Sequence, residues 1–81
     1  MGNSLKKKLD EKAGKTLNYL VNSPQVKTVF IVSESVQKRN YIDNFLLNCK
    51  ELIGRGIKIK PQENYPRHLN MSENYIVCVD D

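Results

Sequence analysis

Two short, uninterrupted apolar runs constrain the fold of this 81-residue chain more than any other feature. Residues 28–32 read TVFIV and residues 75–79 read YIVCV, so both are rich in β-branched and aromatic side chains. A strand with one wet face alternates apolar and polar residues, whereas a strand covered on both faces is apolar throughout. The two runs therefore predict strands of a parallel sheet that is covered on both faces.

Two amphipathic helices are expected to cover that sheet. Apolar residues recur at three- and four-residue spacing, which is typical of one helical face. Over residues 4–22 this stripe comprises Leu5, Leu9, Ala13, Leu17, Leu20 and Val21. In the second helix it comprises Tyr41, Ile42, Phe45, Leu46, Cys49, Leu52 and Ile53. We expect the second helix on one face of the sheet and the first helix on the other.

The remaining segments complete the topology. Residues 57–60 alternate as IKIK, which indicates an edge strand, and residues 61–74 are polar and read as a long loop. A strand–helix–strand crossover is almost always right-handed. We predict a single compact α/β domain over residues 1–81, with a small three-stranded, largely parallel sheet of order 2-1-3 flanked by two helices. The orientation of the third strand is left open.

The third strand raises the question of oligomeric state. It would lie at an edge, although its apolar sequence is typical of an interior strand. An exposed apolar edge promotes aggregation unless something covers it. Pairing with a second copy would solve this, since two-fold dimers are the commonest oligomers, and so would burial beneath the proline-containing loop. We therefore expect either homodimerisation through the third strand or burial of this strand beneath the loop.

Charge is distributed unevenly along the chain. The 13 basic and 9 acidic residues give a net charge of +4. Residues 1–30 hold six lysines against two acidic residues, whereas residues 31–81 hold seven charges of each sign. Five of the lysines belong to the first predicted helix: Lys6, Lys7, Lys8, Lys12 and Lys15. The run at 6–8 is expected in the first turn of that helix. Lysines on one helix are suited to phosphates, because each contact releases a counterion.

Two hypotheses for function follow. The first is a non-catalytic module that binds nucleic acid or another polyanion through the five lysines, without sequence specificity, and with Tyr19 or Tyr65 available for base stacking. The alternative is a protein-binding adaptor or inhibitor, of the kind that viruses and mobile elements encode. It would act through Val36 and Leu47, which lie opposite the apolar stripe of the second helix, and Tyr65 in the proline-containing loop. The choice among DNA, RNA and an acidic protein stays open.

Catalytic motifs are incomplete. Gly14-Lys15-Thr16 ends like a phosphate-binding loop, but Leu9 stands where that motif needs its first glycine, so we interpret the segment as helix. Residues 30–35 resemble the glutamate strand of the Toprim domains of topoisomerases and primases, without their Asp-x-Asp motif. Glu34 and Asp80/Asp81 would meet at one sheet edge, where carboxylates could hold magnesium. We weigh this as a minor alternative and expect no enzyme activity, metal or cofactor.

The setting is expected to be cytoplasmic. Cys49 and Cys78 are too few for a disulfide scaffold and are expected to be small core residues. His68 is the only histidine, which makes a poor metal site. Because no apolar run approaches the roughly 18 residues of a membrane helix, we expect no integral membrane association.

Overall fold

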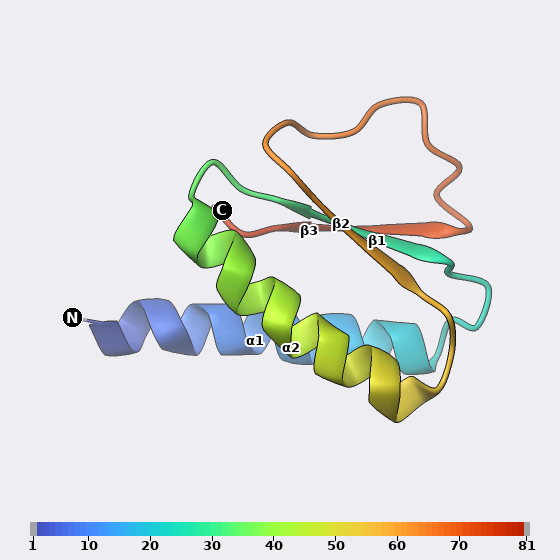
Figure 1. Ribbon diagram of the computed structural model, residues 1–81, viewed down its shortest axis with the longest axis horizontal. Coiled ribbons are helices and arrows are strands. Elements are labelled where there is room, and N and C mark those ends of the chain that lie inside the picture. The colour runs from blue at the N-terminus through green and yellow to red at the C-terminus, as the bar shows by residue number, and fades with distance from the viewer. Residues whose placement is uncertain (1, 81) are drawn as a thin grey trace.

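The computed structural model describes residues 2–80 of the protein, and their side chains from residue 6 onward. It contains two helices and three strands (Figure 1). In chain order these are α1 (Gly2–Val21), β1 (Thr28–Val32), α2 (Val36–Ile53), β2 (Lys58–Gln62) and β3 (Asn74–Cys78). The small α/β fold predicted from the sequence is confirmed.

The sheet has the predicted order, β2-β1-β3, with β1 in the centre. Both neighbours run parallel to β1, which settles the orientation of the third strand. In this register Phe30 lies between Lys60 and Ile76. The carboxyl ends of all three strands therefore lie at the same end of the sheet.

Both helices pack on the same face of the sheet, so the expectation of one helix on each face is wrong. In Figure 1 α1 and α2 lie below the strands, and the segment 63–73 arches above them. The helices contact each other directly, and the Tyr41 hydroxyl donates a hydrogen bond to the Asp10 carboxylate. This bond, with a smaller contribution from burial, raises the pKa of Tyr41 above its ordinary value. Right-handed crossover fixes the side of α2, but α1 precedes the first strand and no crossover rule constrains it.

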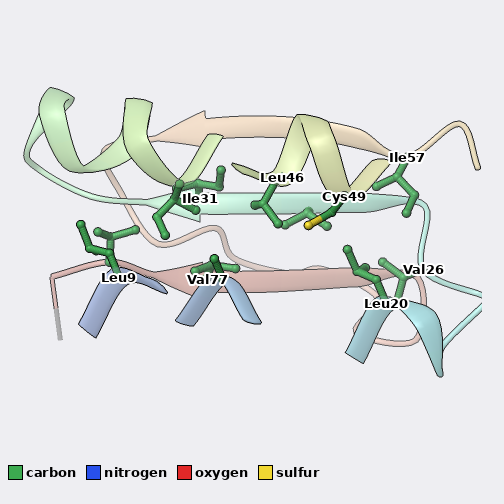
Figure 2. Packing of buried hydrophobic residues seen from close by; sticks show 12 residues of the cluster. Leu9, Leu20, Val26, Ile31, Leu46, Cys49, Ile57 and Val77 are labelled. Atoms are coloured by element: carbon green, nitrogen blue, oxygen red, sulfur yellow. The ribbon is translucent and has the colours of Figure 1, made fainter. Parts of the chain in front are cut away.

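The hydrophobic core lies between the helix pair and the sheet (Figure 2). Val29 and Ile31 of β1 are fully buried there, together with Val77 of β3. The helices contribute Leu9, Ala13 and Leu20 from α1, and Ile42, Leu46 and Cys49 from α2. Three residues assigned to the apolar stripes are exposed instead: Val21, Tyr41 and Leu52. Leu5 lies outside the described side chains.

The opposite face of the sheet is covered by irregular chain. Phe30 alternates with the core residues Val29 and Ile31, so it points away from the helices, yet it is only 7% exposed. The segment 63–73 crosses this side of the sheet (Figure 1). The uninterrupted apolar sequence of β1 thus reflects a helix layer on one face and a loop layer on the other.

The two edges of the sheet are protected in different ways. β2 extends to residue 62 and includes Pro61, which the sequence placed in the loop. The Lys58 N–H donates to the Lys27 carbonyl just before β1, and the Gln62 carbonyl accepts from the Ser33 N–H. Because alternate residues of β2 bond to β1, the backbone of Pro61 faces the outer edge of the sheet. Its missing N–H therefore costs no ladder hydrogen bond. At the β3 edge, the Lys12 ammonium on α1 donates to the Cys78 carbonyl.

Helix α1 begins earlier than the periodicity indicated. Because it starts at Gly2 rather than near residue 4, the lysine run at 6–8 lies in the second helical turn. The unfavourable effect of the helix dipole on these lysines is therefore smaller than expected, since it fades after the first turn. Gly14 lies inside α1, which confirms the helical interpretation of the Gly-Lys-Thr segment. Within residues 2–80, neither helix combines the length and apolar character that crossing a bilayer requires.

Candidate functional site

Four of the five lysines singled out by the sequence point into solvent. Lys6, Lys7, Lys8 and Lys15 are exposed on α1, and in the described part of the chain none of them forms an ion pair. Lys12 differs, because it is half-buried and donates to the Cys78 carbonyl. The structure thus divides the lysine cluster into four solvated cations and one that also anchors α1 to β3.

A single stripe on α1 combines positive charge with an aromatic ring. Its members are spaced by four, three and four residues, which places them within about 60° of the helix circumference. We call these residues the basic stripe: Lys8, Lys12, Lys15 and Tyr19. The stripe runs along the side of α1 that faces β3, where Tyr19 stacks on Tyr75 with ring centroids 4.5 Å apart and an interplanar angle of 20°. Tyr75 in turn packs against the hydrophobic core.

A groove of about 260 Å³ runs between the basic stripe and β3. It is lined by Lys12, Lys15, Thr16, Tyr75, Ile76, Val77 and Cys78. Thr16 is buried, and its hydroxyl donates to the Lys12 carbonyl at 2.8 Å, so this polar group is already satisfied within the helix. Lys12 is engaged with Cys78, so the groups of this groove that face a ligand are the Lys15 ammonium along one wall and the Tyr75 ring.

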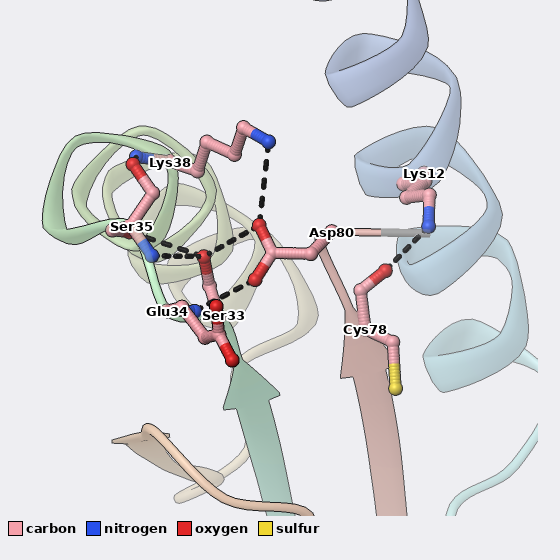
Figure 3. A network of polar contacts seen from close by, with 7 residues as sticks. All are labelled: Lys12, Ser33, Glu34, Ser35, Lys38, Cys78 and Asp80. Carbon is pink, nitrogen blue, oxygen red and sulfur yellow. Dashed lines mark hydrogen bonds and ion pairs between the residues drawn. The ribbon is translucent and has the colours of Figure 1, made fainter.

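A second polar cluster lies at the carboxyl ends of β1 and β3 (Figure 3). The Asp80 carboxylate accepts from the Glu34 backbone N–H at 2.7 Å and from the Ser33 hydroxyl at 3.1 Å. The Lys38 ammonium lies 3.3 Å away and completes the set. The hydrogen bond from Glu34 N–H does most to hold the pKa of Asp80 below its ordinary value, helped by Lys38 and Ser33 and partly opposed by desolvation. Asp80 therefore serves as an internal anion at the start of α2, which begins after Ser35.

This cluster includes Glu34 and Asp80, two of the residues considered for magnesium binding. Glu34 contributes its backbone N–H to the cluster, while the Asp80 carboxylate is surrounded by donors, one of them a cation. Asp81 lies outside the described residues. Among residues 2–80, no group of three histidine, cysteine or acidic side chains is placed to hold a metal ion.

The three residues of the protein-binding hypothesis do not form one surface. Val36, Leu47 and Tyr65 are all exposed, at 58%, 46% and 58%. Val36 and Leu47 lie eleven residues apart on α2, which corresponds to about 16 Å along the helix axis. Tyr65 belongs to the segment 63–73, which crosses the sheet face opposite the helices. A partner that contacted all three would have to reach around the sheet.

An apolar groove that the sequence did not indicate lies where α1 and α2 end. It measures about 480 Å³ and is lined by Leu17, Val21, Pro24, Leu52, Ile53 and Arg55. The Arg55 guanidinium donates to the Ser23 carbonyl at 3.0 Å and to the Leu20 carbonyl, so it closes the end of α1. Val21 and Leu52 are 61% and 79% exposed. Their positions at the ends of two apolar stripes were the only sequence signal for this groove.

The two cysteines are not joined by a disulfide, and Cys49 is buried in the core. Burial raises the pKa of the Cys49 thiol, so at neutral pH it stays protonated and is a poor nucleophile.

Comparison of the chain with known protein families, with curated proteins and with solved structures finds no match in any of the three.

Proposed function

We propose that this protein is a non-catalytic module that binds nucleic acid without sequence specificity, through the lysines of α1. One observation carries the proposal: Lys6, Lys7, Lys8 and Lys15 are solvent-exposed on a single helix, without ion pairs in the described part of the chain. A cluster of cations without internal partners attracts anionic ligands over several ångströms and raises their rate of association. The proposed setting is cytoplasmic, in keeping with two cysteines that are not joined by a disulfide.

Nucleic acid is the polyanion that fits this arrangement best. Lys8 and Lys15 lie on one side of α1, while Lys6 and Lys7 point in other directions from its amino-terminal half. Together these cations can meet several phosphates, and each contact gains free energy by releasing a condensed counterion. Four contacts predict that the logarithm of the association constant falls with the logarithm of salt concentration with a slope of about −3 to −4. Contacts of this kind orient the ligand but carry no sequence information.

The test is a pair of double variants with identical changes in charge. Lys8→Gln with Lys15→Gln removes two cations from the basic stripe, and Lys58→Gln with Lys60→Gln removes two exposed lysines from β2. Binding of labelled DNA and RNA is measured by fluorescence anisotropy at two salt concentrations. The stripe variant is expected to bind at least tenfold more weakly at low salt, with a shallower salt slope, and the β2 variant is expected to bind within twofold of the wild type.

Two results would contradict the proposal. Equal losses in both variants would mean that only net charge matters, and the absence of salt-dependent binding would remove nucleic acid as the ligand. Melting temperatures within one or two degrees of the wild type would show that the substitutions left the fold intact.

The adaptor or inhibitor function stays a second proposal, with Val36 and Leu47 on α2 as its contact residues. Tyr65 is left out, because the segment 63–73 lies on the other side of the sheet from α2. The apolar groove beside Leu52 is a separate surface that also favours protein binding, since exposed apolar residues bordered by polar ones are typical of such surfaces. Leu52→Asp changes a side chain that is 79% exposed, so it is expected to preserve both the fold and nucleic-acid binding. A loss of nucleic-acid binding in this variant would show that the two surfaces are not independent.

A further inference from the structure

The basic stripe ends in an aromatic ring that is held in place from behind. Tyr19 is 39% exposed and forms the outer ring of the stack with Tyr75. Tyr75 is the inner ring, and it packs against the core. A ring fixed in this way can receive another flat group with little further loss of conformational freedom.

We infer that the ligand of this surface is single-stranded nucleic acid, with a base stacked on Tyr19 and the neighbouring phosphates held by Lys15 and Lys8. The inference rests on the proposed function and specifies its substrate class. It joins two observations made independently: the four-three-four spacing that aligns the lysines with Tyr19, and the ring stack that fixes Tyr19 beside β3.

Single strands fit this surface better than a duplex for a physical reason. In a duplex the faces of the bases are stacked on one another, so only base edges and phosphates are accessible. A single strand can turn a base outward onto an aromatic ring while a basic groove follows its backbone. Here the groove beside Lys15 has a volume of about 260 Å³, and the Lys15 ammonium and the Tyr75 ring both line it. Such a groove suits one nucleotide and its phosphate rather than the width of a double helix.

Tyr19 and Tyr65, the two tyrosines considered for base stacking, lie on different parts of the molecule. Tyr65 is more exposed, at 58%, but it lies in the segment 63–73 on the opposite side of the sheet from α1. The segment that carries Tyr65 therefore lies on the far side of the sheet from the basic stripe. This makes Tyr65 a matched control, because the same substitution removes the same kind of ring from a surface without the stripe.

The test measures anisotropy of a labelled 12-nucleotide oligo(dT) and of a 12-base-pair duplex at one low salt concentration. The wild type is expected to prefer the single strand. Tyr19→Leu is expected to weaken single-strand binding about tenfold and to change duplex binding less than twofold, since stacking is lost and the lysines remain. Tyr19→Phe keeps the ring and is expected to retain single-strand affinity, and Tyr65→Leu is expected to have no effect on either ligand.

The outcomes separate this inference from the proposed function. Equal wild-type affinity for the two ligands, or equal losses for both in Tyr19→Leu, would overturn the single-strand inference and leave phosphate binding by α1 standing. Salt-dependent binding of neither ligand would overturn both. A melting temperature for Tyr19→Leu close to that of Tyr19→Phe would show that the loss comes from the missing ring rather than from unfolding.

Discussion

The two helices of this protein end in different ways. At the start of α2 the Ser35 hydroxyl accepts from the Lys38 N–H at 3.4 Å, and at its end Gly54 adopts a left-handed φ of 71° and donates to the Lys50 carbonyl at 3.0 Å. At the end of α1 the Asn22 side chain donates to the Asn18 carbonyl at 2.9 Å, and the Arg55 guanidinium donates to the carbonyls of Leu20 and, just beyond the helix, Ser23. The end of α2 is thus closed by its own sequence, whereas the end of α1 also depends on a residue that follows α2.

The outer surfaces of the helices differ as well. At the amino end of α2, Lys38 is engaged by the Asp80 carboxylate, so this cation takes part in the internal network. On α1, Lys8 and Lys15 extend into solvent without ion pairs in the described part of the chain. The contrast teaches that Lys38 of α2 serves the fold, whereas Lys8 and Lys15 of α1 are available to a ligand.

The substitution with the largest expected effect removes the contact of Arg55 with the end of α1. Arg55→Met removes two charge-assisted hydrogen bonds from the carbonyls of Leu20 and Ser23, which is expected to cost about 1–3 kcal/mol of unfolding free energy. The buried Arg55 Nε has no acceptor among the residues that the structure describes, so removing it recovers part of that cost and places the expected loss toward the lower end. Urea denaturation measures the change. Arg55→Lys is expected to lose less than Arg55→Met, and an Arg55→Met protein as stable as the wild type would contradict this role.

Replacing one glycine of each helix segment by alanine is expected to change the free energy of unfolding in opposite directions. Gly14 lies inside α1 with open space where a Cβ would point, so Gly14→Ala is expected to stabilise by about 0.5–1 kcal/mol. Gly54 has a left-handed backbone, so Gly54→Ala is expected to destabilise by about 1–2 kcal/mol. Thermal and urea unfolding of both variants check the signs. A destabilising Gly14→Ala would mean that residue 14 is not in a regular helix.

The third prediction concerns pH and the carboxylate at the start of α2. Because the pKa of Asp80 is lowered in the folded protein, its charged form favours folding above the ordinary value of 3.8, and this contribution disappears as pH falls through the folded pKa. Asp80→Asn should therefore be less stable than the wild type near neutral pH. The difference should be constant above about pH 5 and vanish in strong acid. Urea midpoints of both proteins between pH 2.5 and 7 measure it, and a difference that grew toward low pH would refute the assignment.

Sequence patterns were sufficient for the sheet but not for the placement of α1. The continuous run at 28–32 predicted a strand covered on both faces, and the predicted strand order 2-1-3 is the one observed. No comparable rule acts on a helix that precedes the first strand, so α1 could have packed on either face. Its packing beside α2 leaves Tyr41 and Leu52 at the margins of the helix pair, where they are partly or largely exposed.

In the candidate site, too, local sequence patterns predicted some features, while others depend on where α1 packs. Lysine spacing on a helix is local information: Lys6, Lys7, Lys8 and Lys15 are exposed on α1, whereas Lys12 is half-buried. The contacts of Lys12 with Cys78 and of Tyr19 with Tyr75 join positions more than fifty residues apart in the chain. Neither contact has a local signal, because each depends on where α1 lies relative to β3. Tyr65 was misgrouped with Leu47 for the same reason.

The outward-facing Pro61 has a consequence for growth of the sheet between molecules. A filament of stacked sheets needs each molecule to accept a strand on one border and to offer one on the other. At the Pro61 position of β2 the backbone has no hydrogen to give an incoming strand. Association through β3 would therefore end with two molecules, because the free border of such a pair would be the proline-bearing one on both sides.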